Sequence, residues 1–325
     1  MHNAYSDALD AMLRDHSTPA AVRAIEAGGS PMALWRMLQE SGFADCLLPE
    51  AADGAGLPLC EVAPMLFAIG QHALPLPLGQ TMLARAVLHG AGVLVPDAPI
   101  ALATFDGAGR THVPGGATAT WFLVQDGSHA AMVHRDEADI AGNGVHGDLG
   151  VTIARSPASS FPLPAGTLRT IGACVHAAQM AGALSRVFDM TLQYANDRAQ
   201  FGRPIGKFQA IQHQISVMAE HVAAARMAAQ IACASDGWQP ERMRAAIGKL
   251  NASEAVTPVT SMAHAVHGAI GVTEEYDLQL YTRRLHAWRL ADGSERFWAR
   301  EIGEATCDAG VGTVDALRGW STDAV

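Results

Sequence analysis

The most informative stretch of the sequence is Arg198-Ala199-Gln200-Phe201-Gly202-Arg203-Pro204-Ile205-Gly206-Lys207-Phe208-Gln209. It lies between two segments with helical periodicity, so we expect a compact loop that joins two long helices. The loop offers two guanidinium groups, one ammonium group, side-chain amides and backbone amides next to glycine. Guanidinium forks and helix N-termini bind phosphate groups. The stretch therefore predicts either a phosphate or pyrophosphate contact or a helix connection with solvated charges.

Helical periodicity extends on both sides of this loop. One helix face before it is formed by Leu184, Val187, Phe188, Thr191 and Tyr194. One helix face after it is formed by Phe208, Ile211, Ile215, Met218 and Val222. We expect a third helix over residues 240–266. Stripes of this kind form a packed core more often than a cofactor contact, so they predict a C-terminal bundle of long antiparallel helices.

Towards the N-terminus the pattern changes twice. The run Thr120-Trp121-Phe122-Leu123-Val124 and the run Ala130-Ala131-Met132-Val133 are typical of strands, and Asp126-Gly127 between them indicates a turn. Before these runs the sequence is helical again, with one helix expected over 60–71 and another from about Thr81. The fold is therefore predicted to be mainly α with a small β middle domain. The expected domains are a helical N-terminal domain at 1–96, a reduced β domain at 97–167 and a helical bundle at 168–325.

Composition excludes several classes of protein. The 325 residues include 22 Lys and Arg and 32 Asp and Glu, which gives a net charge of −10 and disfavours nucleic acid or an anionic membrane as partner. No apolar run reaches about 18 residues, so we expect no membrane span. The N-terminus lacks a secretory pattern, and the five widely spaced cysteines form no CxxC pair. We therefore expect a cytoplasmic protein with reduced cysteines, each a small buried hydrophobic residue.

Two later stretches carry groups that could do chemistry. His264 and His267 are three residues apart, but no third metal ligand has a suitable spacing, so we expect no metal site. In Asp292-Gly293 a carboxylate precedes a glycine, which fits either a general base or an ordinary turn aspartate, and Ser294 fits the N-cap of a final helix. The motifs of serine hydrolases, P-loop NTPases, Rossmann enzymes and HExxH zinc proteases are absent from the sequence.

Taken together, these stretches resemble the acyl-CoA dehydrogenase family. Residues 198–206, continued by Phe208-Gln209-Ala210, are similar to the signature of that family's C-terminal domain. His267-Gly268-Ala269-Ile270-Gly271 resembles its glycine-rich turn, and Ala291-Asp292-Gly293-Ser294 stands where the family has Tyr-Glu-Gly-Thr. Residues 48–57 and 74–81 are similar to parts of the family's first domain. The resemblance implies an α-helical N-domain, a β middle domain and a C-terminal four-helix bundle.

The resemblance also implies an activity and a set of site residues. Family members bind FAD and a CoA thioester, and a carboxylate removes the α-proton while the β-hydrogen leaves as hydride. Electron-transfer flavoprotein or a similar acceptor, and lipid or steroid catabolism, are implied as well. The catalytic base would be Asp292. Cofactor binding would fall to Arg198, Gln200, Phe201, Ile205, Phe208, Gln209, His267, Gly268 and Ser294.

Three departures from the family pattern shape our expectation. Asp292 is one methylene shorter than the family's glutamate, Ala265 replaces a glutamine, and the strands that cradle the flavin are not recognisable in the short middle domain. We therefore expect that this chain does not hold FAD in the usual way by itself. It resembles the short subunit of the heteromeric acyl-CoA dehydrogenases of bacterial steroid degradation, in which the loop at 198–209 would complete the FAD site of a larger partner in a heterotetramer.

Two alternatives stay open. The chain could be a self-sufficient FAD dehydrogenase or oxidase that uses Asp292 as base and assembles as a homodimer or homotetramer. It could also be a non-catalytic subunit that uses the fold for assembly, which the replacement by Ala265 and the short middle domain favour.

Overall fold

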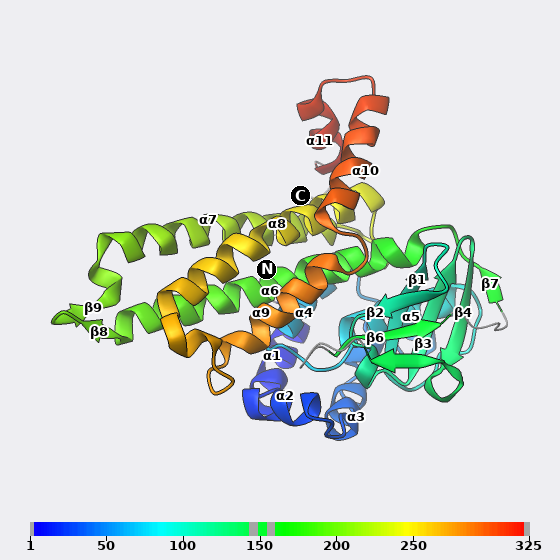
Figure 1. Cartoon of the computed structure of the whole chain (residues 1–325). Helices are drawn as coiled ribbons and strands as arrows, with labels where there is room; N and C mark the ends of the chain where they lie inside the picture. Colours follow the sequence, from blue (N-terminus) through cyan, green and yellow to red (C-terminus); the bar gives the residue numbers. More distant parts are fainter. Residues whose placement is uncertain (1–2, 143–148, 155–159, 322–325) are drawn as a thin grey trace.

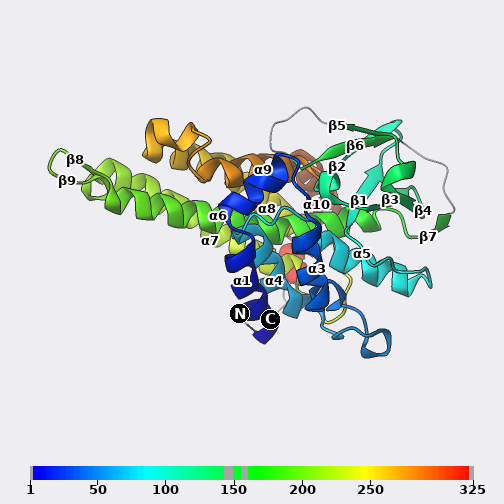
Figure 2. The same cartoon turned by 90° about the horizontal axis from the view of Figure 1, so that it is seen from below.

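The structure is a computed structural model, and it describes residues 3–142, 149–154 and 160–321. In this part of the chain a helical segment comes first, a β segment follows, and long helices complete the fold (Figure 1). The N-terminal helices and the β segment both pack against α6, the longest helix (Figures 1 and 2). The expectation of a mainly helical fold with a small β region is confirmed.

The N-terminal segment consists of short helices with one buried face each. They are α1 (Ala4–His16), α2 (Pro19–Glu26), α3 (Met32–Glu40), α4 (Leu59–Gln71) and α5 (Leu78–Gly90). In α3 the residues Leu34, Trp35 and Leu38 are buried at helical spacing. Helix α5 starts at Leu78 and not near Thr81, because the chain already turns into the helix directly after Pro77. Helix α5 packs against the first strand of the β segment.

The β segment forms two small sheets. The first has the order β1-β3-β4-β7 (Ile100–Phe105, Trp121–Asp126, His129–His134, Ser160–Pro162), and the second has the order β2-β6-β5 (Arg110–Val113, Val151–Ala154, Ile140–Gly142). Strand β1 runs parallel to β3, whereas β3 and β4, the two β-prone runs of the sequence, pair antiparallel across the turn at Asp126-Gly127, with Val124 opposite Ala131. The outer edge of β1 is not left open, because the Leu102 amide donates to Gln80 Oε1 at 2.7 Å.

Side chains alternate along β1 in the way a half-buried strand requires. Ala101, Ala103 and Phe105 point into an apolar core between the two sheets. Ile100 and Leu102 belong to the core that the β segment shares with the helices. By the same alternation Thr104 lies on the helix-facing side of the sheet.

The long helices are α6 (Thr167–Asp197), α7 (Gln209–Ala232), α8 (Arg242–His267) and α9 (Leu278–Leu290). Met180, Leu184, Met218, Val256 and Leu285 are among the buried residues of their shared core. Helices α10 (Glu295–Asp308) and α11 (Thr313–Ser321) project from this bundle (Figure 1). Among the described residues, none of the helices has the length and apolar composition needed to cross a membrane.

The cysteines only partly follow the expectation. Cys46, Cys174 and Cys233 are buried, but Cys60 and Cys307 are exposed, so the expectation that every cysteine is buried was wrong. Cys60 lies in the first turn of α4 and Cys307 in the last turn of the projecting α10, and both side chains are exposed there. The Sγ atoms of Cys174 and Cys233 lie 3.4 Å apart as free thiols between α6 and the end of α7.

Candidate active site

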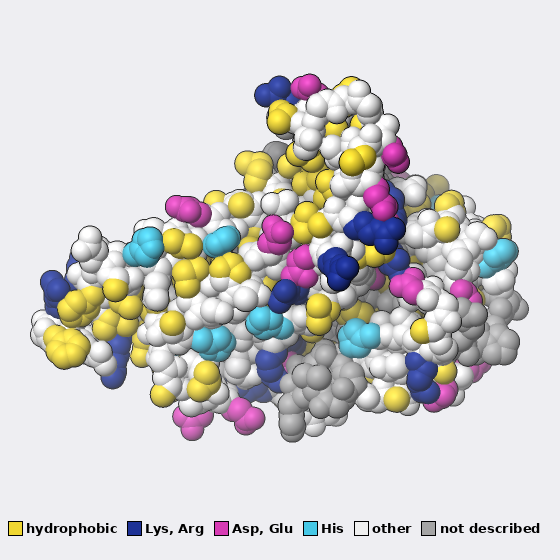
Figure 3. All heavy atoms as spheres, turned by 45° about the horizontal axis from the view of Figure 1, so that its top comes forward, with side chains coloured by type: hydrophobic (Ala, Val, Ile, Leu, Met, Phe, Trp, Pro, Cys, Tyr) yellow, Lys and Arg dark blue, Asp and Glu magenta, His cyan; other side chains and the backbone are white. Residues whose placement is uncertain are grey.

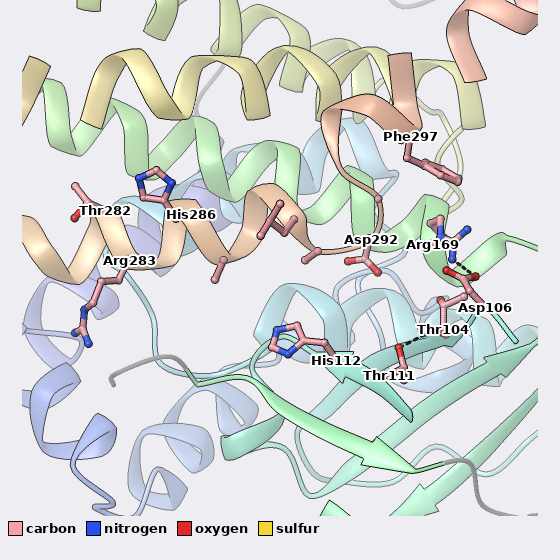
Figure 4. A pocket seen from close by; sticks show the side chains of 14 residues that line it. Thr104, Asp106, Thr111, His112, Arg169, Thr282, Arg283, His286, Asp292 and Phe297 are labelled. Carbon is pink, nitrogen blue, oxygen red and sulfur yellow. Dashed lines mark hydrogen bonds and ion pairs between the residues drawn. The ribbon is translucent and has the colours of Figure 1, made fainter. Parts of the chain in front are cut away.

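A cavity of about 760 Å³ lies between the β segment and the C-terminal helices (Figure 4). Strands β1 and β2 form one wall, and α9, the turn after it and α10 form the other. Its lining includes Thr104, Asp106, His112, Arg169, Asp292 and Phe297. Asp292, which the sequence singled out as a candidate base, therefore faces a space large enough for a substrate.

The turn that carries Asp292 has an unusual backbone. Helix α9 ends at Leu290, and Asp292 then adopts a φ of 53°, in the left-handed region that non-glycine residues rarely occupy. Gly293 follows with a φ of 103°, and a Cβ there would lie 2.7 Å from Trp298 Nε1. The Trp298 indole donates to the backbone oxygen of Asp292 at 3.0 Å. Non-glycine residues in such a conformation are often found at functional sites, and here the surrounding packing holds the residue in place.

A buried lysine fixes both sides of this turn. Lys249, from the middle of α8, is fully buried, and its ammonium group donates to the backbone oxygens of Arg289 at 2.8 Å and Gly293 at 3.0 Å. Its third partner is Ser253 Oγ at 3.3 Å. Burial lowers the pKa of Lys249 to about 8, although the carboxylates of Asp292 and Glu295 oppose this shift. The lysine therefore clamps the chain on either side of Asp292 and places a cation near its carboxylate.

The carboxylate of Asp292 rests on helix α6. Its Oδ2 atom lies 2.9 Å from Nδ1 of His176, whose side chain is 1% exposed, whereas the side chain of Asp292 is 10% exposed. A Cβ on Gly172, one helical turn before His176, would lie 2.3 Å from Oδ2. Only glycine leaves room for the carboxylate at this point of the helix. Among the described residues, Oδ1 makes no hydrogen bond, and Asp292 lines the cavity.

Sequence reasoning missed four residues of this site. His176 and Lys249 sit in the interior of helices 116 and 43 residues away from Asp292, and only the packing of α6 and α8 brings them there. Gly172 lies in an ordinary helical run. Thr104 lines the cavity from β1, and its buried hydroxyl has no hydrogen-bond partner among the described residues. The polar residue among the apolar residues of the strand 100–105 was the available signal for Thr104.

The residues at 198–209 lie at the other end of the bundle. They form a β-hairpin and not the expected loop, with β8 (Ala199–Gln200) paired to β9 (Arg203–Pro204). Phe201 and Gly202 both have positive φ values, 52° and 79°, as a two-residue hairpin turn requires. The Phe201 side chain is 92% exposed. Figure 3 shows hydrophobic and basic side chains together at this tip of the molecule.

The structure brings together at this tip the two stretches for which the sequence predicts cofactor binding. Ile205 is buried against Val266, directly before the turn at His267 and Gly268. His267 stacks on Tyr194 with 4.5 Å between ring centroids, and Nδ1 lies 2.7 Å from the Ala263 oxygen. Its Nε2 lies 3.2 Å from the Tyr276 hydroxyl, so both ring nitrogens are engaged within the chain. Arg198, Gln200 and Gln209 are exposed, and Phe208 is half-buried beneath the Arg203 guanidinium.

Asp292 and Ser294 are far from this tip. Asp292 touches Gly172, and Arg198 follows α6 at its end, 26 residues later. At a rise of about 1.5 Å per residue this separates the two points by about 39 Å along the helix. Ser294 is the N-cap residue of α10, but its hydroxyl makes no capping hydrogen bond. Within one chain, the residues at the two ends cannot contact the same bound molecule of ordinary cofactor size.

Comparison with known proteins agrees with this arrangement. Residues 169–306 match the family model described as "Acyl-CoA dehydrogenase, C-terminal domain". The acyl-CoA dehydrogenase IpdE2 of Mycolicibacterium smegmatis is 34% identical over 299 residues, which cover 86% of this chain and 90% of the relative. IpdE2 of Mycobacterium tuberculosis is 32% identical over 301 residues, with 86% of this chain and 89% of the relative covered.

Solved structures show the same fold. A variant of the Tcur3481–Tcur3483 steroid ACAD superposes with a TM-score of 0.82 at 24% identity and covers 94% of this chain and 98% of its own. The ChsE4–ChsE5 complex from Mycobacterium tuberculosis gives a TM-score of 0.75 at 20% identity, with 96% and 99% covered. The fold, the cavity beside Asp292 and the extended similarity to IpdE2 together show that the chain belongs to the acyl-CoA dehydrogenase family.

Proposed function

We propose that this chain is a short acyl-CoA dehydrogenase subunit that supplies the catalytic base, Asp292, and completes an FAD site together with a larger partner subunit. The observation that carries the proposal is the carboxylate of Asp292, which lines a cavity of about 760 Å³ and is held by His176 and by the Lys249 clamp. A vestigial site has no need of a glycine beneath the carboxylate or of a buried lysine around its turn.

The chemistry assigned to Asp292 is removal of the α-proton of an acyl-CoA thioester. The Cα–H bond breaks, an O–H bond forms on the carboxylate, and a double bond forms between Cα and Cβ as the β-hydrogen leaves as hydride. Bound FAD supplies the acceptor for that hydride.

The cavity lining offers a polar group that could bind a flavin ring. Thr104 offers a buried hydroxyl without a partner, and such a group is suited to a hydrogen bond with a polar edge of a bound ring system. Ser294 offers a second hydroxyl that makes no capping bond. Of these two residues, Thr104 lines the cavity and would face a flavin there, whereas Arg198, Gln200, Phe201 and Gln209 would reach a cofactor held by a neighbouring subunit.

The hairpin supports a partner subunit. Phe201 places an almost fully exposed aromatic ring at a left-handed position of the turn, where glycine or asparagine is usual. Exposure of this kind is common at protein interfaces, where aromatic residues are enriched. Two solved neighbours of this fold are complexes of two named chains, Tcur3481–Tcur3483 and ChsE4–ChsE5. A larger acyl-CoA dehydrogenase chain is therefore the proposed partner, and electron-transfer flavoprotein or a similar protein is the proposed electron acceptor.

The first test is the visible absorption spectrum of the chain purified alone and after co-expression with a full-length acyl-CoA dehydrogenase subunit. We expect a colourless chain alone and a yellow complex that desaturates an acyl-CoA thioester. Arg198→Ala should lower the FAD content of the complex, whereas Arg300→Ala should leave it unchanged, because Arg300 is an exposed residue on α10. A complex that keeps its full FAD content and activity with Arg198→Ala would contradict the proposal.

A self-sufficient flavoenzyme is the second candidate. The cavity between β1 and α9 lies within this single chain, and the Thr104 hydroxyl on its wall has no hydrogen-bond partner among the described residues. Both observations favour this candidate. If the chain alone carries about one FAD and oxidises an acyl-CoA, this candidate replaces the first. Asp292 would be the base in both cases.

A further inference from the structure

The buried histidine beside the candidate base makes a contact that the reaction outlined above does not use. His176 lies in the middle of α6, is 1% exposed, and places Nδ1 2.9 Å from Oδ2 of Asp292. Its other ring nitrogen, Nε2, is buried and has no hydrogen-bond partner among the described residues. His176 does not line the cavity, so a substrate there meets the aspartate and not the imidazole.

We propose that His176 is a positioning residue for the catalytic carboxylate: its Nδ1–H holds Oδ2 of Asp292, so that Oδ1 is the atom that receives the α-proton. The inference rests on the proposed role of Asp292 as base. It assigns different tasks to the two oxygens of one carboxylate, one held by the protein and one turned to the substrate.

The unpartnered nitrogen determines which tautomer is present. A doubly protonated ring would bury a charged N–H without an acceptor, and a ring protonated at Nε2 alone would bury a neutral N–H without one. Protonation at Nδ1 leaves only a bare lone pair at Nε2, which is the least costly of the three arrangements. The ring then donates to Asp292, and the carboxylate accepts in its charged form.

The other charged groups around the carboxylate favour the same state. From α8, Lys249 contributes a buried ammonium group whose electrostatic interaction with Asp292 is favourable. Arg289 and Glu295, at the two ends of the turn, form an ion pair with each other. Across the cavity, Arg169 pairs with Asp106. Among the described residues Lys249 forms no ion pair of its own, so its charge and the His176 N–H both act on the Asp292 carboxylate.

Gly172 makes this arrangement possible. A side chain at that position would occupy the space of both carboxylate oxygens, since a Cβ would lie 2.3 Å from Oδ2 and 2.6 Å from Oδ1. Residues 172 and 176 are one turn apart on the same face of α6, so the glycine supplies the space and the histidine supplies the donor. Aspartate is one methylene shorter than glutamate, and the Asp292 side chain reaches α6 from a turn in which its own backbone has a positive φ.

The test uses NMR of the full chain and needs no substrate. In protein labelled with ¹⁵N-histidine, the signals of His176 are those that disappear in His176→Asn. We expect a protonated Nδ1 and an unprotonated Nε2 near neutral pH. A proton on Nε2 would overturn the proposal, and this measurement on the unmodified chain does not depend on whether a variant folds.

The second measurement follows the carboxyl carbon of Asp292 in protein labelled with ¹³C-aspartate, assigned by its loss in Asp292→Asn. His176→Phe keeps the bulk but removes the donor, so Asp292 should take up its proton at higher pH than in the wild type. His176→Asn, which can place an amide N–H where Nδ1 stands, should restore the wild-type titration. Cys174→Ala, a buried change on the same helix, should leave it unchanged. An identical titration with phenylalanine at 176 would also overturn the proposal.

These outcomes differ from a failure of the proposed function. If Asp292 is not the base, the Asp292→Asn variant keeps its turnover, while the NMR signals of His176 and Asp292 in the unmodified chain still agree with the expectation. If the positioning role is wrong, Asp292→Asn abolishes turnover while the tautomer or the titration contradicts the expectation.

Discussion

Nδ1 of His176 lies 2.9 Å from Oδ2 of Asp292, although the two residues are 116 positions apart in the sequence. The contact joins the longest helix of the bundle to the turn between α9 and α10. It turns an aspartate of an Asp-Gly pair, which is an ordinary turn residue in most proteins, into a largely buried carboxylate. One of its oxygens is held by His176, and the other has no hydrogen-bond partner among the described residues. The site can therefore be tested at residues that touch this carboxylate directly.

Replacing the candidate base should abolish catalysis without unfolding the protein. Asp292→Asn keeps the shape of the side chain and can still accept a hydrogen bond from His176, but it cannot take a proton. We expect turnover of an acyl-CoA thioester by the reconstituted enzyme to fall about 10²- to 10⁴-fold. Asp139→Asn, at an exposed carboxylate on the β segment, should keep its activity. Comparable turnover in both variants would exclude Asp292 as the base.

The glycine beneath the carboxylate should matter for activity more than for stability. Gly172→Ala would place a methyl group 2.3 Å from Asp292 Oδ2, so the carboxylate must move. A displacement of about 1 Å can cost about 100-fold in rate. The matched control is Gly303→Ala in α10, where an added Cβ meets no atom within 4 Å and should raise stability by up to about 1 kcal/mol. Steady-state kinetics and thermal unfolding measure the activity and the stability of the two variants. A fully active Gly172→Ala variant would show that catalysis does not need the close contact between residue 172 and the Asp292 carboxylate.

The buried lysine should give the stability of the protein a characteristic pH dependence. The pKa of Lys249 is lowered from 10.5 to about 8 by burial, so the folded chain binds fewer protons than the unfolded chain between these values. Its contribution to stability is therefore unfavourable below about pH 8 and improves by about 3 kcal/mol as pH rises from 8 to 10.5.

Lys249→Met isolates this effect, because it removes the titrating group and keeps an extended side chain. The difference in unfolding free energy between wild type and variant, measured by urea denaturation at several pH values, should shift in favour of the wild type between pH 8 and 10.5. A difference that does not vary with pH would show that folding does not lower the pKa of Lys249.

An ion pair between the N-terminal helices and α9 should be important for stability. Glu26 on α2 and Arg284 on α9 are 2.6 Å apart, and both side chains are only 7% exposed. Burial lowers the pKa of Arg284, and the charge of Glu26 counteracts this shift. Glu26→Gln leaves a buried guanidinium without its counter-charge and should cost about 3 kcal/mol or more. Glu304→Gln, in an exposed pair with Arg300, should cost less than about 1 kcal/mol. Equal small losses in chemical denaturation would contradict this view.

A substitution at the tip of the hairpin should raise the stability of the isolated chain but weaken its binding to a partner subunit. Phe201 is 92% exposed and has a φ of 52°, so Phe201→Gly relieves a strained turn and should raise the stability of the isolated chain by up to about 1 kcal/mol. If the ring docks against a partner, the same variant should bind the partner subunit at least tenfold more weakly. Thermal unfolding of the chain alone and titration with the partner give the two values. Unchanged affinity would remove Phe201 from the interface.

Much of the architecture follows from local patterns. The stripes at helical spacing predicted α6 and α7, the helical pattern over 240–266 predicted α8, and the two β-prone runs around Asp126-Gly127 predicted the strands β3 and β4. These predictions hold because a stripe of apolar residues must be buried, and its period identifies the element that can bury it. The resemblance to the family was readable from the residues 198–209 and 267–271 because these motifs are contiguous in the sequence.

The composition of the candidate active site was not readable in this way. Asp292 was visible as a carboxylate in a turn, but His176, Gly172 and Lys249 lie inside helices and break no local pattern. Their meaning arises only when α6 and α8 pack against the turn after α9, because a hydrogen bond or a close contact depends on distances of a few ångströms that sequence spacing does not encode. The sequence by itself determined the elements and the family; the tertiary structure alone decided which side chains surround the carboxylate, since packing brings together residues that are more than a hundred positions apart.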